Sequence, residues 1–443
     1  MAKLFGTDGV RGVAGRWPLT PDFVRRLGWA AGRELSARAA GRRRALLIVR
    51  DTRASGPALQ RALSAGLSAA GVRPLDGGVL PTAAVAAVAP RLNVLGGAVL
   101  SASHNPAEFN GVKFFDPHGL KWADRLENAV EALALSPAPM PRAAHRSTPF
   151  PEARRRYLGF LRGAVPAGLS LRGVPLVIDC ANGAASGVAP GLFRSLGAKV
   201  VVLSAAPNGR NINRGCGALH PEALARAVRR TGAALGVAFD GDSDRAIFVD
   251  EGGHVRDGDA VLLLAARRWA FLNRLKANRV VVTVMTNLGL FRALEALGIQ
   301  TETTAVGDKN VWEGMKKTGA VLGGEPSGHV IFRDFLPTGD GLLTALQVLT
   351  VLAETGRPLS ALASLGVRYP QVLLNVPVKE RRPLDRVPGF AAALAAVQRA
   401  LGSTGRTLIR YSGTEPLLRV MVEGPDHAAI ERHAQVLARA AVR

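Results

Sequence analysis

Short apolar runs alternate with longer segments of helical periodicity through the first 365 residues of the chain. The run at 45–49 is predicted to form a buried strand. A helix is predicted before it, because Thr20 suits the cap position and Pro21 the first turn. A polar loop at 51–56 follows the strand, and then a second helix near 57–70. Strand, polar loop and helix in this order are typical of α/β proteins.

The same order of elements recurs in two further stretches, which predicts three similar α/β units, each with a mixed sheet between helices. The last part of the chain differs, because two strands with a helix between them, a third strand and a closing helix indicate a smaller α+β domain. The stretch 136–151 is rich in proline and alanine and is interpreted as a linker. We therefore predict four domains, at 1–150, 151–254, 255–365 and 366–443.

The stretch from Gly97 to Pro106 ends an apolar run in small and polar residues. A buried strand of an α/β protein delivers such side chains to the sheet edge where ligands bind. Ser101 still lies in the apolar run, whereas Ser103 lies where the strand should open into a loop, so Ser103 is the better nucleophile candidate. His104 follows directly, but neighbours on an extended chain point apart, and we do not expect the two to form a catalytic pair.

Three carboxylates, Asp240, Asp242 and Asp244, alternate along a loop between two apolar segments. Carboxylates crowded this closely repel one another unless a cation neutralises them, and oxygen ligands suit Mg²⁺ or Ca²⁺. A calcium-binding helix–loop–helix is excluded because its sixth loop position, a glycine, is Arg245 here and a strand is predicted next. Three ligands leave Mg²⁺ with open positions, which a phosphate oxygen usually occupies. The loop is therefore predicted to bind one Mg²⁺.

A glycine-rich loop after a short apolar segment carries Glu325, Ser327 and His329. These side chains are suited to binding sugar hydroxyls or an amine, or to moving a proton. Near the N-terminus, Arg11 lies in a polar loop flanked by glycines, where a cation can be presented to a ligand.

A phosphate-binding loop is predicted at the start of the last strand pair. An arginine, two hydroxyls and a glycine that exposes backbone N–H groups are compact donors for an anion. These residues are Arg410, Ser412, Gly413 and Thr414, and Arg419 adds a second arginine.

Charge and composition narrow the class of protein. Hydrophobic residues make up 48% of the chain and charged residues 21%, as in an ordinary globular protein. No apolar run reaches the roughly 18 residues of a membrane span, the N-terminus lacks the apolar core of a signal peptide, and two cysteines do not indicate a disulfide framework. We therefore expect a cytoplasmic protein. The net charge of +23 is scattered in short clusters, so we expect anionic small substrates rather than nucleic acid as partners.

Together the loops indicate phosphoryl transfer. A serine accepts and donates the phosphoryl group, a divalent cation offsets charge on its oxygens, and a separate loop fixes a phosphate that does not react. Positioning and electrostatics carry most of the catalysis in this class of reaction.

The order of the motifs resembles that of the α-D-phosphohexomutase superfamily over the whole chain. The motifs are Ser101-Ala-Ser-His-Asn-Pro106, Asp240-Gly-Asp-Ser-Asp-Arg245, Gly324-Glu-Pro-Ser-Gly-His329 and Arg410-Tyr-Ser-Gly-Thr-Glu-Pro416. The opening Phe5-Gly-Thr-Asp-Gly-Val-Arg-Gly12 and the C-terminal motif are most similar to the branch that interconverts glucosamine 6-phosphate and glucosamine 1-phosphate, towards UDP-N-acetylglucosamine and the cell wall. The resemblance implies four domains around a central cleft.

The resemblance also implies roles for individual residues. Ser103 is implied as the phosphoserine, with Mg²⁺ held by its phosphate and the three aspartates, and a hexosamine 1,6-bisphosphate as the activating phosphoryl donor. Glu325 and Ser327 are implied to contact the sugar, and residues 410, 412–414 and 419 to bind the distal phosphate. The residues implied near the chemistry are Arg11, His104, Lys113, Arg245 and His329. A homodimer is an expectation from the resemblance alone.

Some positions depart from the family pattern, and rival functions stay open. Pro326 stands where glutamine is common, which removes a polar side chain from the sugar loop, and Lys309 stands where arginine is usual. The nearest alternative is a phosphomannomutase/phosphoglucomutase of the same superfamily. A phosphoserine-dependent hydrolase and a nucleic-acid-binding protein are the alternatives from other classes.

Overall fold

The computed structural model describes residues 4–6, 8–39, 41–141, 147–364, 366–378, 380–411 and 416–441. The chain divides into two compact units. The first comprises Met1–Thr283 and Ile299–Ser364, and the second Val284–Gly298 and Leu365–Arg443. No helix among the described residues is both long and apolar enough to cross a membrane.

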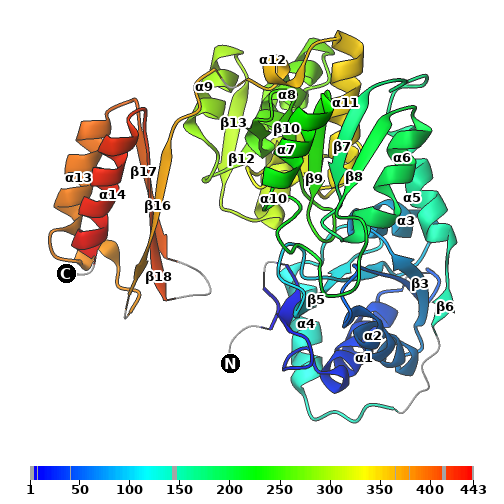
Figure 1. The fold of residues 1–443 in the computed structure, drawn as a ribbon. Coiled ribbons are helices and arrows are strands. Elements are labelled where there is room, and N and C mark those ends of the chain that lie inside the picture. Colours follow the sequence, from blue (N-terminus) through cyan, green and yellow to red (C-terminus); the bar gives the residue numbers. More distant parts are fainter. Residues whose placement is uncertain are drawn as a thin grey trace. The chain divides into compact units, whose positions relative to one another are not determined.

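The first sheet of the first unit has the order β1-β5-β4-β2-β3-β6, and its strands β3, β5 and β6 are labelled in Figure 1. Strand β5 is antiparallel to β1 and β4, and the other neighbours are parallel. Its strands are β1 Val10–Val13, β2 Ala45–Arg50, β3 Arg73–Val79, β4 Gly97–Leu100, β5 Phe109–Phe115 and β6 Thr148–Pro149. Its helices are α1 Pro21–Ala37, α2 Gly56–Ala69, α3 Ala83–Val88, the short 3₁₀ helix η1 Ala89–Leu92, α4 Asp124–Leu135 and α5 Glu152–Gly163.

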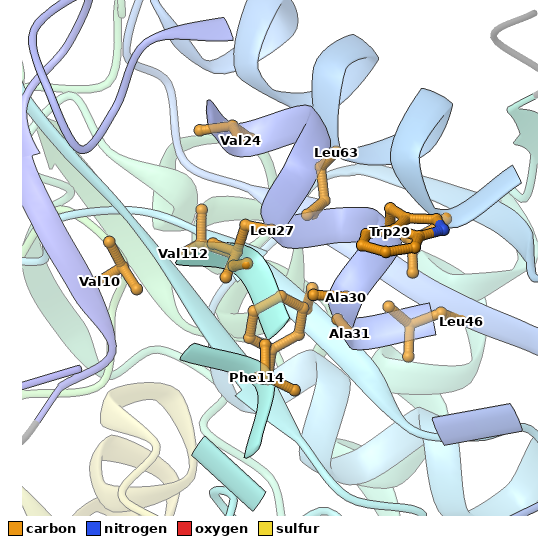
Figure 2. Packing of buried hydrophobic residues seen from close by; sticks show 14 of the residues in the cluster. Val10, Val24, Leu27, Trp29, Ala30, Ala31, Leu46, Leu63, Val112 and Phe114 are labelled. Atoms are coloured by element: carbon orange, nitrogen blue, oxygen red, sulfur yellow. The ribbon is translucent and has the colours of Figure 1, made fainter. Parts of the chain in front are cut away.

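The core of this sheet explains why β4 and residues 45–49 of β2 are apolar. Leu46 on β2 and Phe114 on β5 pack with α1 and α2 (Figure 2), while α3 contacts β2 and β4 with its own apolar residues. A strand buried on both faces needs hydrophobic side chains at every position. The result is that β4 ends at a rigid edge, directly before Ser101.

The second sheet has the order β11-β10-β9-β7-β8, with β7 parallel to β8 and β9, and β10 antiparallel to β9 and β11. Its strands are β7 Pro175–Asp179, β8 Lys199–Leu203, β9 Leu235–Phe239, β10 Ala246–Asp250 and β11 Val255–Arg256. Its helices are η2 Ala184–Gly187, α6 Ala189–Ser195 and α7 Glu222–Thr231. The loop that carries Asp240, Asp242 and Asp244, called the acidic loop below, connects β9 to β10.

The third sheet has the order β13-β12-β14-β15, and only the β14–β15 pairing is antiparallel among the described strands. Its strands are β12 Arg279–Thr283, β13 Gln300–Thr304, β14 Leu322–Gly324 and β15 Val330–Phe332. The nearby helices are α8 Gly258–Phe271, η3 Lys276–Asn278, α10 Asp308–Thr318, α11 Gly341–Thr355 and α12 Leu359–Leu362. The glycine-rich loop that carries Glu325, Ser327 and His329, called the sugar loop below, connects β14 to β15.

The second unit is an antiparallel sheet of order β16-β18-β17. Its elements are α9 Leu288–Ala296, β16 Gln371–Pro377, η4 Leu384–Arg386, α13 Phe390–Leu401, β17 Arg406–Tyr411, β18 Leu417–Glu423 and α14 His427–Ala441. Its buried core is formed by the sheet with α13 and α14. The predicted fold class, three α/β units with mixed sheets and a smaller α+β domain, is confirmed.

Two local features are not visible in the sequence pattern. The segment 184–195 forms two helical pieces, η2 and α6, rather than one helix, because Pro190 lacks the N–H that a continuous helix requires and sits in the first turn of α6. The stretch 136–151, predicted as a linker, also contains the two-residue strand β6, which pairs with β3. Short edge strands of this kind carry too few residues to show a periodicity.

Candidate active site

Ser103 follows β4 in a left-handed backbone conformation, with φ of 50°. A residue other than glycine adopts this conformation at a cost of about 1–3 kcal/mol, so the surroundings must hold it. The Ser103 N–H donates to Ser101 Oγ at 2.8 Å, and the Ser101 hydroxyl donates to Asp51 Oδ2 at 2.6 Å. Ser101 is fully buried. The structure thus assigns Ser101 a structural contact rather than a place facing a ligand.

Arg53 stabilises the rest of this loop through hydrogen bonds to its carbonyl groups. Its guanidinium is buried and donates to Asp51 at 2.8 Å and to the carbonyls of Ser103 at 2.9 Å and Asn105 at 2.8 Å. The Asn213 amide donates to the Ser103 carbonyl as well, at 2.8 Å. Because a guanidinium has five fixed donors, one side chain fixes several loop carbonyls at once.

The Ser103 hydroxyl meets both a carboxylate and an imidazole. It donates to Asp240 Oδ2 at 2.5 Å and lies 3.3 Å from His104 Nδ1. The expectation that Ser103 and His104 point apart was wrong, because Ser103 is left-handed rather than extended. Burial lowers the pKa of His104 to about 4, and the charges of Arg245 and Arg11 lower it in the same direction. His104 is therefore neutral at pH 7.

The acidic loop gathers its three carboxylates. One ligand atom each from Asp240, Asp242 and Asp244 lies within 4.8 Å of the others, and all three residues are buried. Burial raises the pKa of Asp240 well above its usual range, and the Asp244 and Asp242 carboxylates raise it further. A carboxylate in this position needs a cation to remain ionised.

The donors around the loop leave two oxygens for such a cation. Lys113 Nζ donates to Asp242 Oδ2 at 2.8 Å and lies 3.6 Å from Asp244 Oδ2. Among the described residues no hydrogen-bond donor reaches the buried Oδ1 atom of Asp242 or of Asp244. Carboxylate oxygens are the ligands that Mg²⁺ prefers, and together with the Ser103 oxygen they fit such an ion.

The sugar loop lies against the acidic loop. Ala246 N–H donates to the Gly328 carbonyl at 3.1 Å, and His329 Nδ1 lies 3.8 Å from Asp244 Oδ1. His329 Nε2 accepts from the Gly339 N–H at 3.0 Å, so Nδ1 carries a proton. Glu325 and Ser327 stand in the same loop. Glu325 accepts from the Gly307 N–H at 2.9 Å, and the buried Ser327 hydroxyl has no hydrogen-bond partner within the described ranges.

A partly buried charge network joins the first and third sheets and could not be predicted from the sequence. Lys121 forms ion pairs with both Asp8 and Asp308, and Arg11 pairs with Asp8 at 2.5 Å. Burial would raise the pKa of Asp8, but Lys113, Lys121 and Arg11 hold it well below its usual value. Lys309 pairs with Glu127 at 2.9 Å. No local pattern signals this network, because each residue stands alone in its own segment.

The second unit contains the two arginines of the predicted phosphate-binding loop. Arg410 on β17 and Arg419 on β18 are cross-strand partners. Burial lowers the pKa of Arg410, and the charge of Arg419 lowers it further. The predicted partners Ser412, Gly413 and Thr414 lie outside the described residues.

Comparison with known proteins covers the chain from end to end. Four models of phosphoglucomutase/phosphomannomutase match, alpha/beta/alpha domain I at 2–138, domain II at 156–253, domain III at 257–369 and the C-terminal domain at 373–440. The phosphoglucosamine mutase of Syntrophotalea carbinolica is 46% identical, covering 98% of this chain and 96% of its own. That of Desulforudis audaxviator is 47% identical, covering 99% and 98%. This chain belongs to the phosphoglucosamine mutase family.

Solved structures of the wider family share the fold. A phosphoglucomutase/phosphomannomutase family protein from Burkholderia thailandensis superposes with a TM-score of 0.80 at 28% identity, covering 99% of this chain and 96% of that one. The N-acetylphosphoglucosamine mutase of Aspergillus fumigatus, solved with GlcNAc-6P and magnesium, has a TM-score of 0.70 at 20% identity, with coverages of 99% and 95%.

Most of the predicted site residues of this phosphoglucosamine mutase family member meet in the first unit. Those in mutual contact are Ser103, His104, Lys113, Asp240, Asp242, Asp244, Arg245 and His329. Arg11 joins them through Asp8, whose neighbours include Lys113. Their individual roles stay predictions.

Proposed function

We propose that this chain is a phosphoglucosamine mutase, which interconverts glucosamine 6-phosphate and glucosamine 1-phosphate through a phosphoserine at Ser103 and a hexosamine 1,6-bisphosphate. The observation that carries the proposal is the hydrogen bond of Ser103 Oγ to the buried aspartate cluster, at 2.5 Å from Asp240. Full-length relatives of 44–47% identity that bear this name support the amino sugar as substrate. The product lies on the way to UDP-N-acetylglucosamine and the cell wall, in the cytoplasm.

The reaction is two phosphoryl transfers. The bond from the Ser103 oxygen to phosphorus breaks as the free sugar hydroxyl forms a new bond to phosphorus, and the proton that the sugar hydroxyl loses is balanced by the one that the Ser103 oxygen takes up. The bisphosphate then turns end for end, and its other phosphoryl group returns to Ser103, so the phosphoenzyme is regenerated. A hexosamine 1,6-bisphosphate from solution is the activating donor for chains that lack the phosphate.

The residues around Ser103 suit this chemistry. A phosphoserine carries a charge of about −1.5 to −2, and the cations Arg11, Lys113 and Arg245 would offset part of it, together with the divalent ion that the aspartates would hold. Burial would lower the pKa of Lys113, but Asp242, Asp8 and Asp244 raise it, so the ammonium stays charged. His104 is neutral and lies 3.3 Å from Ser103 Oγ, which makes it a proton acceptor within reach of the nucleophile.

Asp240, Asp242 and Asp244 would hold one Mg²⁺ together with the Ser103 phosphate. Bound there, the ion supplies charge stabilisation for the transferred phosphoryl oxygens. The chain's own part is to keep three carboxylates oriented and buried, so that they need no rearrangement when charge develops.

The sugar and the distal phosphate have separate sites. Glu325 offers an acceptor to the sugar, and Ser327 offers a hydroxyl that has no hydrogen-bond partner in the described part of the chain. Arg410 and Arg419 stand opposite each other on adjacent strands, and two guanidinium groups so placed suit the binding of one phosphate. A phosphate held there by both arginines and the 412–414 loop does not react, and it fixes the substrate's far end.

Two measurements test the proposal. Intact-mass spectrometry should find one phosphoryl group on the wild type and none on Ser103→Ala, whereas Ser101→Ala should keep it. Coupled assays should give a higher kcat/KM for glucosamine phosphate than for glucose or mannose phosphates. Equal turnover of the three sugars would favour the phosphomannomutase/phosphoglucomutase alternative, and release of inorganic phosphate would favour a hydrolase. A phosphate mapped to Ser101 would refute the assignment of Ser103.

A further inference from the structure

Thr82, which precedes α3 in the first sheet's domain, contacts the acidic loop at two points. Its hydroxyl donates to Asp242 Oδ2 at 2.6 Å, and its backbone N–H donates to the Asp242 carbonyl at 2.9 Å. Thr82 is 1% exposed. A residue from one sheet's domain therefore fixes both the side chain and the backbone of a carboxylate that belongs to the next.

The two contacts leave Asp242 with unequal oxygens. Oδ2 receives the Thr82 hydroxyl and also the Lys113 ammonium at 2.8 Å. Oδ1 is buried and receives no hydrogen bond from the residues that the structure describes. A buried carboxylate oxygen without a donor is costly, because it has lost its water and gained nothing in exchange. A buried oxygen in this state indicates that a ligand binds to it.

Lys113 alone would not fix the carboxylate. Its ammonium is shared with Asp244 at 3.6 Å, and it stands on a flexible stem whose donors rotate. Thr82 is β-branched, so its side chain has few rotamers, and its backbone is tied to the same residue that its hydroxyl holds. The threonine is thus the contact that sets which way the Asp242 carboxylate turns.

We propose that Thr82 is a positioning residue for the divalent cation, because it commits Asp242 Oδ2 to a hydrogen bond and so leaves Oδ1 to the ion. This inference rests on the Mg²⁺ site of the proposed function. Partners of this kind orient the ligands of metal sites, and their loss typically weakens metal affinity about 10–100-fold.

The test is calorimetric titration of MgCl₂ into the metal-free full chain, with intact mass used to match Ser103 phosphorylation between samples. Thr82→Val keeps the shape but removes the hydroxyl, and we expect its Mg²⁺ Kd to rise about 10–100-fold. Thr82→Ser keeps the hydroxyl and should bind as the wild type does. Thr350→Val is the matched control, since the buried Thr350 hydroxyl bonds only the Leu346 carbonyl of its own helix among described partners.

The outcomes separate the two proposals. If the wild type binds no Mg²⁺, the metal site itself is refuted. If the wild type binds and Thr82→Val binds equally tightly, Thr82 does not position the ligand and this inference is overturned. Should Thr82→Val fail to fold by circular dichroism, Thr82→Cys replaces it, because a thiol of similar size is a weak donor. The same criterion then applies, with a weaker Mg²⁺ affinity expected than for Thr82→Ser.

Discussion

The two serines of the first motif show how one residue's backbone decides what its neighbour can do. The Ser101 hydroxyl donates a hydrogen bond to Asp51 and accepts one from the Ser103 N–H. These contacts hold Ser103 in the left-handed conformation in which its own hydroxyl reaches Asp240. The nucleophile is positioned by a residue of the same type two places earlier.

Substitution of the two serines should therefore have opposite effects. Ser101→Ala leaves the buried Asp51 carboxylate and the Ser103 N–H without this partner, and we expect a loss of about 1–3 kcal/mol in the free energy of unfolding. Ser103→Ala should abolish mutase activity with a smaller change in stability. Denaturant unfolding and a coupled assay on both variants check this. An unchanged free energy of unfolding in Ser101→Ala would contradict the structural role of Ser101.

The buried carboxyl group of Asp340 should make the free energy of unfolding depend on pH. Burial raises the pKa of Asp340 to about 6 from 3.8, although the Leu343 and Leu342 amides and the Tyr157 hydroxyl lower it. The folded protein thus holds a proton that the unfolded chain has released between these values. The stabilisation is complete below pH 3.8 and is lost as pH rises through about 6, and it amounts to roughly 3 kcal/mol.

The comparison is with Asp340→Asn, which keeps an acceptor for both amides but does not titrate. From about pH 4 to pH 7, the wild type should lose unfolding free energy relative to the variant, as measured by denaturant titration at several pH values. Parallel stability curves for the two proteins would show that Asp340 has an ordinary pKa.

Residues that are close in sequence could be predicted as a site, and lone residues could not. Asp240, Asp242 and Asp244 share one loop, so their crowding is visible before any fold is known. Thr82 and Lys121 act on partners more than one hundred residues away, and nothing around them marks their chemistry. Only the strand order brings them to the site.

At the scale of elements, α11 supports the acidic loop. The Gly341 N–H donates to the Ser243 carbonyl at 2.9 Å, and a Cβ on Gly341 would lie 2.5 Å from the Arg245 carbonyl oxygen. Asp340 caps this helix through Leu342 and Leu343, and the Tyr157 hydroxyl on α5 bonds both Asp340 oxygens. The start of α11 is thus fixed from one side by α5 and pressed against the acidic loop on the other.

Gly341→Ala should consequently lower both activity and melting temperature, because backbone cannot move aside as a flexible side chain does. Gly159→Ala on α5 is the matched control. A Cβ there meets nothing within 4 Å, and we expect a gain of about 0.5–1 kcal/mol from better helix propensity. Thermal unfolding and mutase assays compare the two. An unimpaired Gly341→Ala would mean that the acidic loop tolerates displacement.

Elements with strong periodicity were predicted, and those with breaker residues were not. The sequence predicts helices such as α1 from their capping residues, and strands such as β2 from an uninterrupted run of hydrophobic residues. Strand β3 contains a proline, an aspartate and two glycines, so its residues resemble a loop. It forms a strand because β2 offers it a parallel partner. The domain boundaries expected near 150, 255 and 366 stay predictions.

For the whole molecule, the net charge of +23 predicts solubility and anion attraction rather than nucleic-acid recognition. We expect no salt-steep binding to DNA at physiological ionic strength. Fluorescence anisotropy with labelled duplex DNA over a salt series measures this. A strong linear fall of log affinity with log salt concentration would identify a phosphate-binding face and contradict the expectation.

The second unit is assembled from two separate segments of the chain, and this affects how genes for such proteins can recombine. Helix α9 belongs to it although the chain returns to the first unit before β16. The Leu288 N–H donates to the buried Glu423 carboxylate at 2.8 Å, Asn287 bonds Tyr369, and Arg406 stacks over Phe291. A crossover near residue 366 would import a C-terminal sheet without its own α9. Chimeras between relatives should therefore remain folded only when residues 284–298 are exchanged together with the C-terminal segment.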